Sequence, residues 1–242
     1  MMKLNVGIVA GRRPNLLATT LQSFQANIFD KCVVEQVRVN LDPIFGDDQS
    51  EADTIQVIRN FFPSAEINTP VQPNFCKAVQ WIWSGMQDGP FLHLEDDWVC
   101  IDEIPIQKIL EDMSDAVKMI LLLSETHGKR GLQRESVRVY KSKIFGLTCK
   151  RRALPTFGTS PSITDGRFAR RAAALFDLTL DPEKQMRDNR NPKLIDFLNG
   201  YRCLFQASQT GTPLIEDIGR AWQSQNNVEK VVEQGVSKWI AS

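Results

Sequence analysis

The sequence is poor in the residues that several classes of protein need. Its 242 residues include two tyrosines, two histidines (His93 and His127) and five cysteines. The cysteine count is odd and no CxxC pair occurs, which argues against a disulfide framework or a structural zinc site. Two histidines exclude a three-histidine metal site. Carboxylates must therefore carry most of any catalytic work.

Long hydrophobic runs are also absent. The longest uninterrupted apolar run, residues 119–123, is far shorter than the roughly 20 residues that span a bilayer. The apolar stretch near the N-terminus is too short for a secretory signal and runs into Arg12 and Arg13. We therefore expect a cytoplasmic protein without a transmembrane helix. The length and the 42% hydrophobic content predict one globular domain over residues 1–242.

The two signs of charge are segregated along the chain, although the net charge is zero. Residues 95–115 hold eight acids and one base, and residues 129–171 hold twelve bases and two acids. Such a basic block indicates a polyanionic partner: a nucleotide diphosphate, a nucleic acid, or a phosphorylated lipid carrier at a membrane surface. The alternative explanation is that these bases lie on solvent-exposed helix and strand faces and balance the charge of the acidic block.

Apolar patterns predict strands that alternate with helices. The predicted strands lie at residues 4–10, 37–41, 65–68 and 91–94, and the predicted helices at 14–24, 52–62 and 74–86. This order indicates an α/β fold with a mostly parallel, doubly wound sheet and helices on both faces.

The pattern changes beyond residue 118. Residues 119–123 predict a strand, and 136–140 with 145–149 predict an antiparallel ribbon added to the sheet edge. Residues 158–163 are predicted to be a loop, followed by C-terminal helices at 165–171, 183–187 and 192–199 and a short strand ending at residue 205.

Acidic residues follow two of the predicted strands. The first strand is followed by Gly-Arg-Arg-Pro at residues 11–14, not by GxGxxG, which argues against a dinucleotide-binding fold. Asp42 follows the second strand, and Glu95, Asp96 and Asp97 follow the fourth. Adjacent carboxylates repel one another unless a cation lies among them. Oxygen ligands suit Mg²⁺ or Mn²⁺, so these residues predict a divalent metal site.

These features together resemble the GT-A glycosyltransferases of the family 2 type. The resemblance covers residues 4–98 and rests on the first strand, Arg13-Pro14 and its helix, the strand ending in Asp42, and the helix at 74–86 leading to the acidic triplet. It implies a GT-A fold in which residues 1–98 bind a nucleotide sugar and residues 99–242 bind the acceptor.

The resemblance also implies roles for single residues. Asp42 would contact the nucleotide base with Arg13 beside it, Asp96 would take the ribose, and Asp97 would hold Mn²⁺ or Mg²⁺ on the diphosphate. Glu95 replaces the first acid of the usual triplet and is kept as a metal candidate.

Four further residues complete the expected donor site. We assign Asn74 and Lys77, at the start of the third helix, to the nucleotide-binding set. The segment containing Asp217 and Arg220 is similar to the closing segment of the family. Asp217 would complete the metal shell, and Arg220 would neutralise the leaving diphosphate.

The catalytic base is less well defined. Glu183, followed by a helix and by Gly-Tyr-Arg at residues 200–202, is similar to the family's acidic catalytic motif and is the first candidate. Asp181 and Asp165 are competitors, and Asp-Pro-Glu at 181–183 is equally explained as a helix start. His127 lies past a strand end, in a solvated loop or facing the acceptor, and His93 is expected to point into packing.

The sequence thus predicts a metal-dependent transferase that moves a sugar from a nucleotide-diphosphate sugar, a UDP-sugar by family resemblance, to a hydroxyl group. The basic block at 129–171 favours DNA as the acceptor, with a flipped-out hydroxymethylated base as in bacteriophage DNA-modifying relatives. A saccharide or a lipid carrier is the alternative acceptor, and inversion or retention at the sugar stays open. A nucleotidyltransferase would need a Gly-rich loop after the first strand. A non-catalytic nucleotide or nucleic-acid binding module would not need the three adjacent carboxylates.

Overall fold

A seven-stranded sheet forms the centre of the computed structural model, which describes residues 2–127, 134–144, 147–187, 190–233 and 236–241. Its strand order is β10-β6-β9-β4-β1-β2-β3, and every strand runs parallel to its neighbours except β9. The strands are β1 (Met2–Ala10), β2 (Cys32–Leu41), β3 (Glu66–Asn68), β4 (Pro90–Glu95), β6 (Val117–Leu122), β9 (Ser162–Asp165) and β10 (Arg202–Gln206). The predicted α/β class with a mostly parallel sheet is confirmed.

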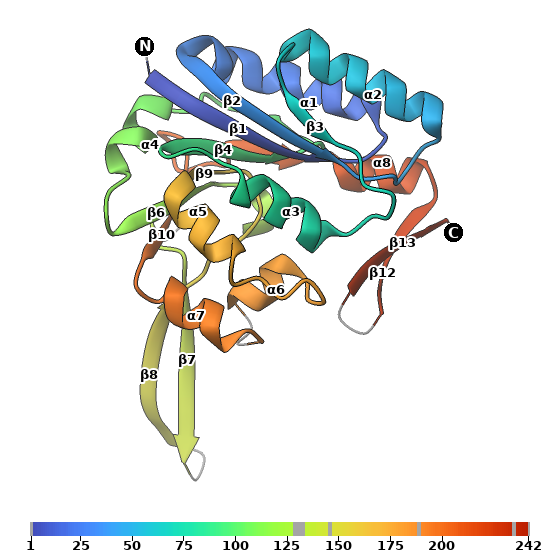
Figure 1. Cartoon of the computed structure of the whole chain (residues 1–242). Helices are drawn as coiled ribbons and strands as arrows, with labels where there is room; N and C mark the ends of the chain where they lie inside the picture. The colour runs from blue at the N-terminus through green and yellow to red at the C-terminus, as the bar shows by residue number, and fades with distance from the viewer. Residues whose placement is uncertain (1, 128–133, 145–146, 188–189, 234–235, 242) are drawn as a thin grey trace.

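Helices cover both faces of this sheet (Figure 1). One face carries α1 (Pro14–Asn27), α2 (Asp48–Phe61) and α4 (Ile106–Asp112). The other carries α3 (Phe75–Ser84), α5 (Gly166–Ala173), α6 (Pro182–Arg187) and α7 (Pro192–Leu198).

Strand β1 shows why both faces are needed. Leu4, Val6 and Ile8 enter the core under α1, whereas Val9 enters the core under α3. Gly7 lies so close to α3 that a Cβ atom there would fall 2.4 Å from the Ile82 side chain. A strand buried on both faces has a nearly continuous apolar sequence, and Asn5 is the one polar residue between Leu4 and Ala10.

Side-chain caps set several helix starts. Asp47 accepts a hydrogen bond from the Ser50 N–H and Asn74 accepts one from the Lys77 N–H, at 2.9 Å each, so they cap α2 and α3. The helix predicted at 52–62 therefore begins earlier, at Asp48. Asp165 caps α5, at the start of the helix predicted at 165–171.

The loop predicted at residues 158–163 is wrong in its last part. There the chain enters β9, which inserts antiparallel between β4 and β6. The hydroxyl groups of Ser162 and Thr164 are buried and lie 3.1 Å apart in a mutual hydrogen bond. The polar composition that predicts a loop is thus accommodated inside the sheet.

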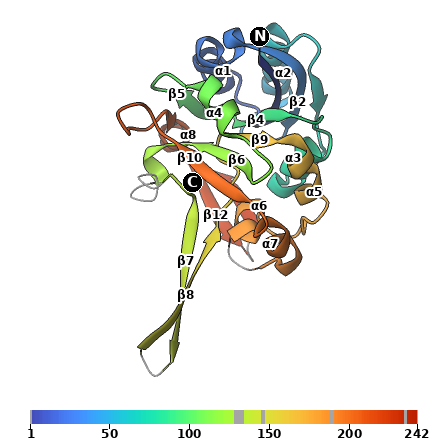
Figure 2. The ribbon, with the colours of Figure 1, turned by 90° about the vertical axis from the view of Figure 1, so that its left-hand side faces the viewer.

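Three two-stranded sheets lie outside the central one. They are β5 (Trp98–Cys100) with β11 (Ile215–Asp217), β12 (Val228–Glu233) with β13 (Val236–Ala241), and β7 (Val137–Ile144) with β8 (Leu147–Pro155). The predicted ribbon is indeed the antiparallel pair β7–β8, which forms a sheet of its own, and it joins the edge of the central sheet at its root, where Glu135 bridges antiparallel to Leu204 of β10. It projects away from the body of the protein (Figure 2).

No helix among the described residues is long and apolar enough to cross a membrane.

Candidate functional site

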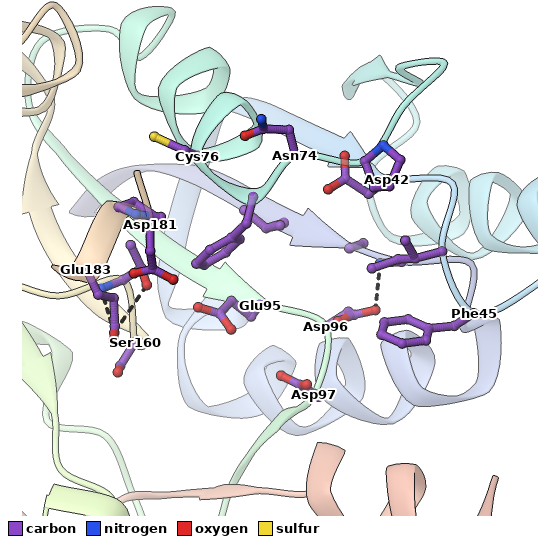
Figure 3. A pocket seen from close by; sticks show the side chains of 18 of the residues that line it. Asp42, Phe45, Asn74, Cys76, Glu95, Asp96, Asp97, Ser160, Asp181 and Glu183 are labelled. Carbon is purple, nitrogen blue, oxygen red and sulfur yellow. Dashed lines mark hydrogen bonds between the residues drawn. The ribbon is translucent and has the colours of Figure 1, made fainter. Parts of the chain in front are cut away.

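A pocket of about 720 Å³ opens at the carboxyl ends of β1, β2 and β4, where ligands of parallel α/β sheets bind. Asp96 and Asp97 lie on one side of it, and Asp181 and Glu183 lie on the facing wall (Figure 3). Asp42 also lines the pocket. The sheet thus brings together acids that are far apart in the sequence.

Asp96 is buried, and its carboxylate is fully used in hydrogen bonds that act as a clamp between two segments of the chain. It is 3% exposed, and its carboxylate accepts hydrogen bonds from the Gly11 N–H at 2.9 Å and from Arg13 Nε and Nη2 at 3.1 and 2.5 Å. Arg13 is itself 6% exposed and also reaches Asp97 at 3.2 Å. Burial lowers the pKa of Arg13, but the two carboxylates raise it by more, so the net shift is upward. This ion pair ties the β1–α1 turn to the end of β4.

Two aromatic rings hold the Arg13 guanidinium in place. Its central carbon lies 4.5 Å from the centre of the Phe45 ring and 5.1 Å from that of Trp222. Phe45 has a φ of +69°, a conformation that bulky side chains rarely adopt. A Cβ atom on Gly11 would fall 2.8 Å from the Phe45 ring, so only glycine fits there. No sequence motif indicated this pair of rings.

Asp97 differs from its neighbour because one of its carboxylate oxygens receives no hydrogen bond within the described part of the chain, and we call this its open oxygen. Its Oδ1 is buried and has no hydrogen-bond partner among the described residues. Burial and then the negative charges of Asp96 and Asp217 raise the pKa of Asp97, while Arg13 opposes the shift. The Ile218 N–H donates to the Asp97 backbone carbonyl at 2.9 Å, which holds the Asp217 segment against it. A cation at this point would relieve the repulsion between these carboxylates.

The residues at Asp97 fit a divalent cation that a substrate phosphate also ligates. Among the described residues, no group of three or more His, Cys, Asp and Glu side chains could hold a metal. Mg²⁺ typically binds one or two carboxylates together with phosphate oxygens and waters. Asp97 and Asp217, both lining the pocket, supply such a pair. Arg220, whose Nε donates to Asp217 at 3.1 Å, lies beside them at the rim.

Asp42 ends a chain of side-chain hydrogen bonds across the sheet edge. The Asn68 amide donates to Asn40 at 2.6 Å, and the Asn40 amide donates to Asp42 at 2.8 Å. Burial raises the pKa of Asp42, whereas hydrogen bonds from Asn40 and from the Asn74 backbone lower it in part. The sequence pattern identified Asp42 and Asn74 but not the two residues that orient Asp42.

Glu183 and Asp181 lie on the facing wall of the pocket, and their carboxylates have different hydrogen-bond partners. The Glu183 carboxylate accepts long hydrogen bonds from the Thr159 N–H and hydroxyl, at 3.4 and 3.3 Å, and pairs with Arg187 at 3.0 Å. Asp181 accepts the Lys184 N–H at 3.0 Å, so its carboxylate is engaged at the start of α6. Glu183 lines the smaller neighbouring cavity as well as this pocket, whereas Asp181 lines this pocket only, so Glu183 is the better placed of the two to contact a substrate that spans both.

A second, smaller cavity of about 180 Å³ adjoins the first and shares Ser160 and Glu183 with it. His127 lines this cavity, half-buried, with its ring 4.9 Å from that of Phe205 and its Nδ1 bonded to Ser124 at 3.0 Å. The expectation of a solvated loop histidine is wrong. Burial lowers the pKa of His127, and the nearby Glu183 raises it in part. Glu183 thus lies where the two cavities meet.

Two of the predicted site residues lie away from the pocket. Asp165 pairs with Pro90, at the opposite end of β4 from Glu95, and caps α5. Lys77 is exposed on α3 and does not line the pocket. The other predicted residues line it: Arg13, Asp42, Asn74, Glu95, Asp96, Asp97, Asp181, Glu183, Asp217 and Arg220.

His93 points into the core, as expected. It is fully buried, and the Trp83 Nε1–H donates to its Nδ1 at 3.2 Å.

No protein-family model and no curated protein matches the sequence. Solved structures do match. Mannosyltransferase PcManGT from Pyrobaculum calidifontis, in complex with GDP-Man and Mn²⁺, aligns with a TM-score of 0.55 and 10% identity over 84% of this chain. S. aureus TarS 1–349, in complex with UDP, aligns with a TM-score of 0.55 and 11% identity over 86%. CMP:2-keto-3-deoxy-manno-octonic acid synthetase, in complex with CTP, aligns with a TM-score of 0.51 and 13% identity over 93%.

The chain has a fold of the GT-A and nucleotidyltransferase type. It spans 55% of the mannosyltransferase, 59% of the TarS fragment and 97% of the synthetase. At these identities the likeness concerns the fold alone.

Proposed function

We propose that the protein is a glycosyltransferase that uses a nucleotide-diphosphate sugar as donor and a divalent cation. The observation that carries the proposal is Asp97 at the carboxyl end of β4: its Oδ1 is buried without a hydrogen-bond partner among the described residues, and the residue lies on the pocket wall opposite Glu183. Residues 1–98 would form the donor half and residues 99–242 the acceptor half of one domain.

The donor would lie along the pocket from Asp42 to Asp97. Asp42, fixed by Asn40, accepts hydrogen bonds from the base, and a uracil N–H would suit it. Asp97 and Asp217 would hold Mn²⁺ or Mg²⁺ against the diphosphate. The bound ion would offset the negative charge that develops on the leaving diphosphate. Arg220 at the rim adds a positive charge for the same group. The ribose contact of Asp96 stays a prediction, since both its oxygens already accept hydrogen bonds from within the protein.

Glu183 would act as the general base. It takes the proton of the acceptor hydroxyl as the acceptor oxygen bonds to the anomeric carbon. The bond from that carbon to the diphosphate oxygen breaks, and the leaving nucleoside diphosphate keeps the electron pair. Thr159 and Arg187 fix the carboxylate for this step. A single displacement of this kind inverts the anomeric configuration.

The acceptor would enter through the smaller cavity beside Glu183. We include DNA with hydroxymethylated bases in the proposal, because the basic block at 129–171 falls in this half of the chain. A saccharide or lipid-carrier acceptor is the alternative.

A nucleotidyltransferase shares the fold but is not favoured by the turn after β1. That turn is only Gly11, Arg12 and Arg13, and the Arg13 side chain is buried against Asp96 instead of facing a phosphate.

The test is turnover. Purified protein is incubated with a panel of nucleotide sugars, Mn²⁺, and hydroxymethylated DNA or simple saccharides, and the nucleoside diphosphate released is measured. We expect one donor to be consumed by wild type and not by Asp97→Asn, with a product of inverted configuration by NMR. Release of pyrophosphate from a nucleoside triphosphate and a sugar phosphate would instead identify a nucleotidyltransferase.

A further inference from the structure

The β7–β8 hairpin is set apart from the rest of the molecule. Its two strands pair with each other over eight residue pairs, from Val137 with Pro155 to Ile144 with Leu147. Both views show it extending as an arm away from the helices and the central sheet (Figures 1 and 2). Its root is anchored, because the Ser136 N–H donates to the Cys203 carbonyl of β10 at 2.9 Å. A two-stranded ribbon alone is marginally stable in water, so a protruding one suggests contact with a partner.

The arm, residues 137–155, carries six basic residues and no acidic one. In its register Lys141 stands opposite Arg151, and Ser142 stands opposite Lys150. Like charges at directly opposed positions destabilise a sheet. A polyanion that neutralises them would remove this penalty. The bases are Arg138, Lys141, Lys143, Lys150, Arg151 and Arg152.

Outside the arm, several bases of the block at 129–171 form ion pairs with acids of the body of the protein. Arg134 pairs with Asp112 at 2.7 Å. Arg167 pairs with Asp88 at 2.7 Å, and Arg170 pairs with the same carboxylate. Lys129 and Arg130 lie outside the described residues. The solvated-face explanation therefore holds for part of the block, and the arm is where its charge is concentrated without acids.

The length of the basic stretch distinguishes between polyanions. From Arg138 to Lys143 the strand advances about 17 Å at 3.4 Å per residue. A membrane that touched the tip of the arm would leave Arg138 beyond the screening length of about 8 Å at physiological salt. A nucleic acid lying along the arm would run past the whole basic stretch. A two-stranded β-ribbon also fits the major groove of duplex DNA.

We infer that the β7–β8 arm binds duplex nucleic acid along its length. Val137 and Thr156, at the root of the arm, line the smaller cavity next to Glu183. A duplex held by the arm is therefore led toward that cavity. That the bound nucleic acid is also the sugar acceptor rests on the proposed function, whereas the binding itself does not.

The test is fluorescence anisotropy of a labelled DNA duplex, titrated with protein in the absence of nucleotide sugar over a series of salt concentrations. The arm variant removes three lysines, and a control variant removes three lysines that form surface ion pairs elsewhere, so that both change the net charge equally. Thermal unfolding verifies that both variants fold. The arm variant is Lys141→Gln, Lys143→Gln and Lys150→Gln, and the control is Lys3→Gln, Lys31→Gln and Lys108→Gln.

We expect the arm variant to bind the duplex about tenfold to one hundredfold more weakly at physiological salt. Its plot of log K against log salt should be shallower than that of wild type by about 0.9 for each phosphate that the variant no longer neutralises. The control and Asp97→Asn should bind as wild type does, which separates failure of the arm from failure of the donor site.

Wild-type affinity in the folded arm variant, or an equally weakened control, would overturn the inference. Vesicles of an anionic phospholipid serve as a second probe. Arm-dependent binding to these vesicles that equals or exceeds binding to DNA would overturn it in favour of a membrane.

Discussion

The two walls of the main pocket are built in different ways. On the β4 wall, Asp96 and Asp97 directly follow a core strand, and Asp96 is locked by a buried arginine. On the facing wall, Glu183 stands at the start of a six-residue helix and is held by long hydrogen bonds and a half-exposed ion pair. The first wall is fixed by the fold itself. The second depends on a few side chains, which would suit the wall where we propose that the acceptor enters.

The same contrast holds between neighbours on the first wall. Asp96 commits its carboxylate to hydrogen bonds within the protein, whereas Asp97 keeps one oxygen open. Stability and substrate binding are therefore expected to separate between two adjacent residues.

The largest effect is expected on the facing wall. Glu183→Gln should lower kcat by about 10²–10⁴, because it removes the base while keeping an acceptor for Thr159. Asp181→Asn is the matched control: asparagine also caps helices, so this variant should keep nearly full activity. The measurement is steady-state kcat of both variants and of wild type, with the donor identified in the turnover assay. Equal decreases in both variants would contradict the difference between the two acids.

On the β4 wall, Asp96→Asn should destabilise the protein by about 3–5 kcal/mol, because Arg13 would keep a buried charge without its main partner. Asp97→Asn should cost much less, since the fold raises the pKa of Asp97 and so disfavours its charged form. Urea unfolding of both variants measures the difference. A stable Asp96→Asn protein would show that the clamp is not structural.

The core behind the β4 wall should be sensitive to acid. Burial lowers the pKa of His93 to about 4, from about 6.5 in an unfolded chain. Between these two pH values the unfolded state binds more protons than the folded state. The contribution of His93 to the free energy of unfolding is therefore complete above pH 6.5 and is lost as the pH falls toward 4. This decrease amounts to about 3 kcal/mol. The pH dependence of unfolding in wild type minus that in His93→Gln isolates it, because other titrating groups cancel. A flat difference would contradict the burial of a neutral imidazole.

The smallest effect is expected from a change in the position of the Asp97 carboxylate that leaves its charge unchanged. A Cβ atom at residue 219 would fall 2.3 Å from Asp97 Oδ2, so Gly219→Ala must displace the carboxylate. We expect nucleotide affinity in Mn²⁺ to fall about tenfold, equivalent to about 1.4 kcal/mol, with the charge unchanged. Gly219 is the first residue of α8 (Gly219–Gln225), and Ala221→Ser in the same helix is the control. Unchanged affinity in Gly219→Ala would mean that the position of Asp97 does not limit binding.

The sequence predicted the β4 wall well because its information is local. Apolar runs mark the strands, and a carboxylate that follows such a run must emerge at the carboxyl end of the sheet. The positions of Asp42, Asp96 and Asp97 follow from that rule. Their different states do not, since the clamp on Asp96 comes from Arg13, 83 residues away.

The facing wall and the arm were harder to predict for physical reasons. Strand β9 has the polar composition of a loop and becomes a strand only because β4 and β6 flank it. Asp165 ranked as a candidate base because nothing local shows which end of the sheet it occupies. The ribbon at β7–β8 was identified by alternation, but nothing local shows that only its root bridges to β10 and that the rest projects from the sheet edge.

The most direct test of the account is calorimetric titration of a panel of nucleoside diphosphates, with and without Mn²⁺, into wild type and Asp97→Asn. The account predicts that one nucleotide binds wild type only with Mn²⁺, and that Asp97→Asn abolishes this binding while unfolding at nearly the wild-type temperature. Binding that is equally strong without the metal, or in the Asp97→Asn variant, would contradict the assignment of the open oxygen to a cation and the diphosphate.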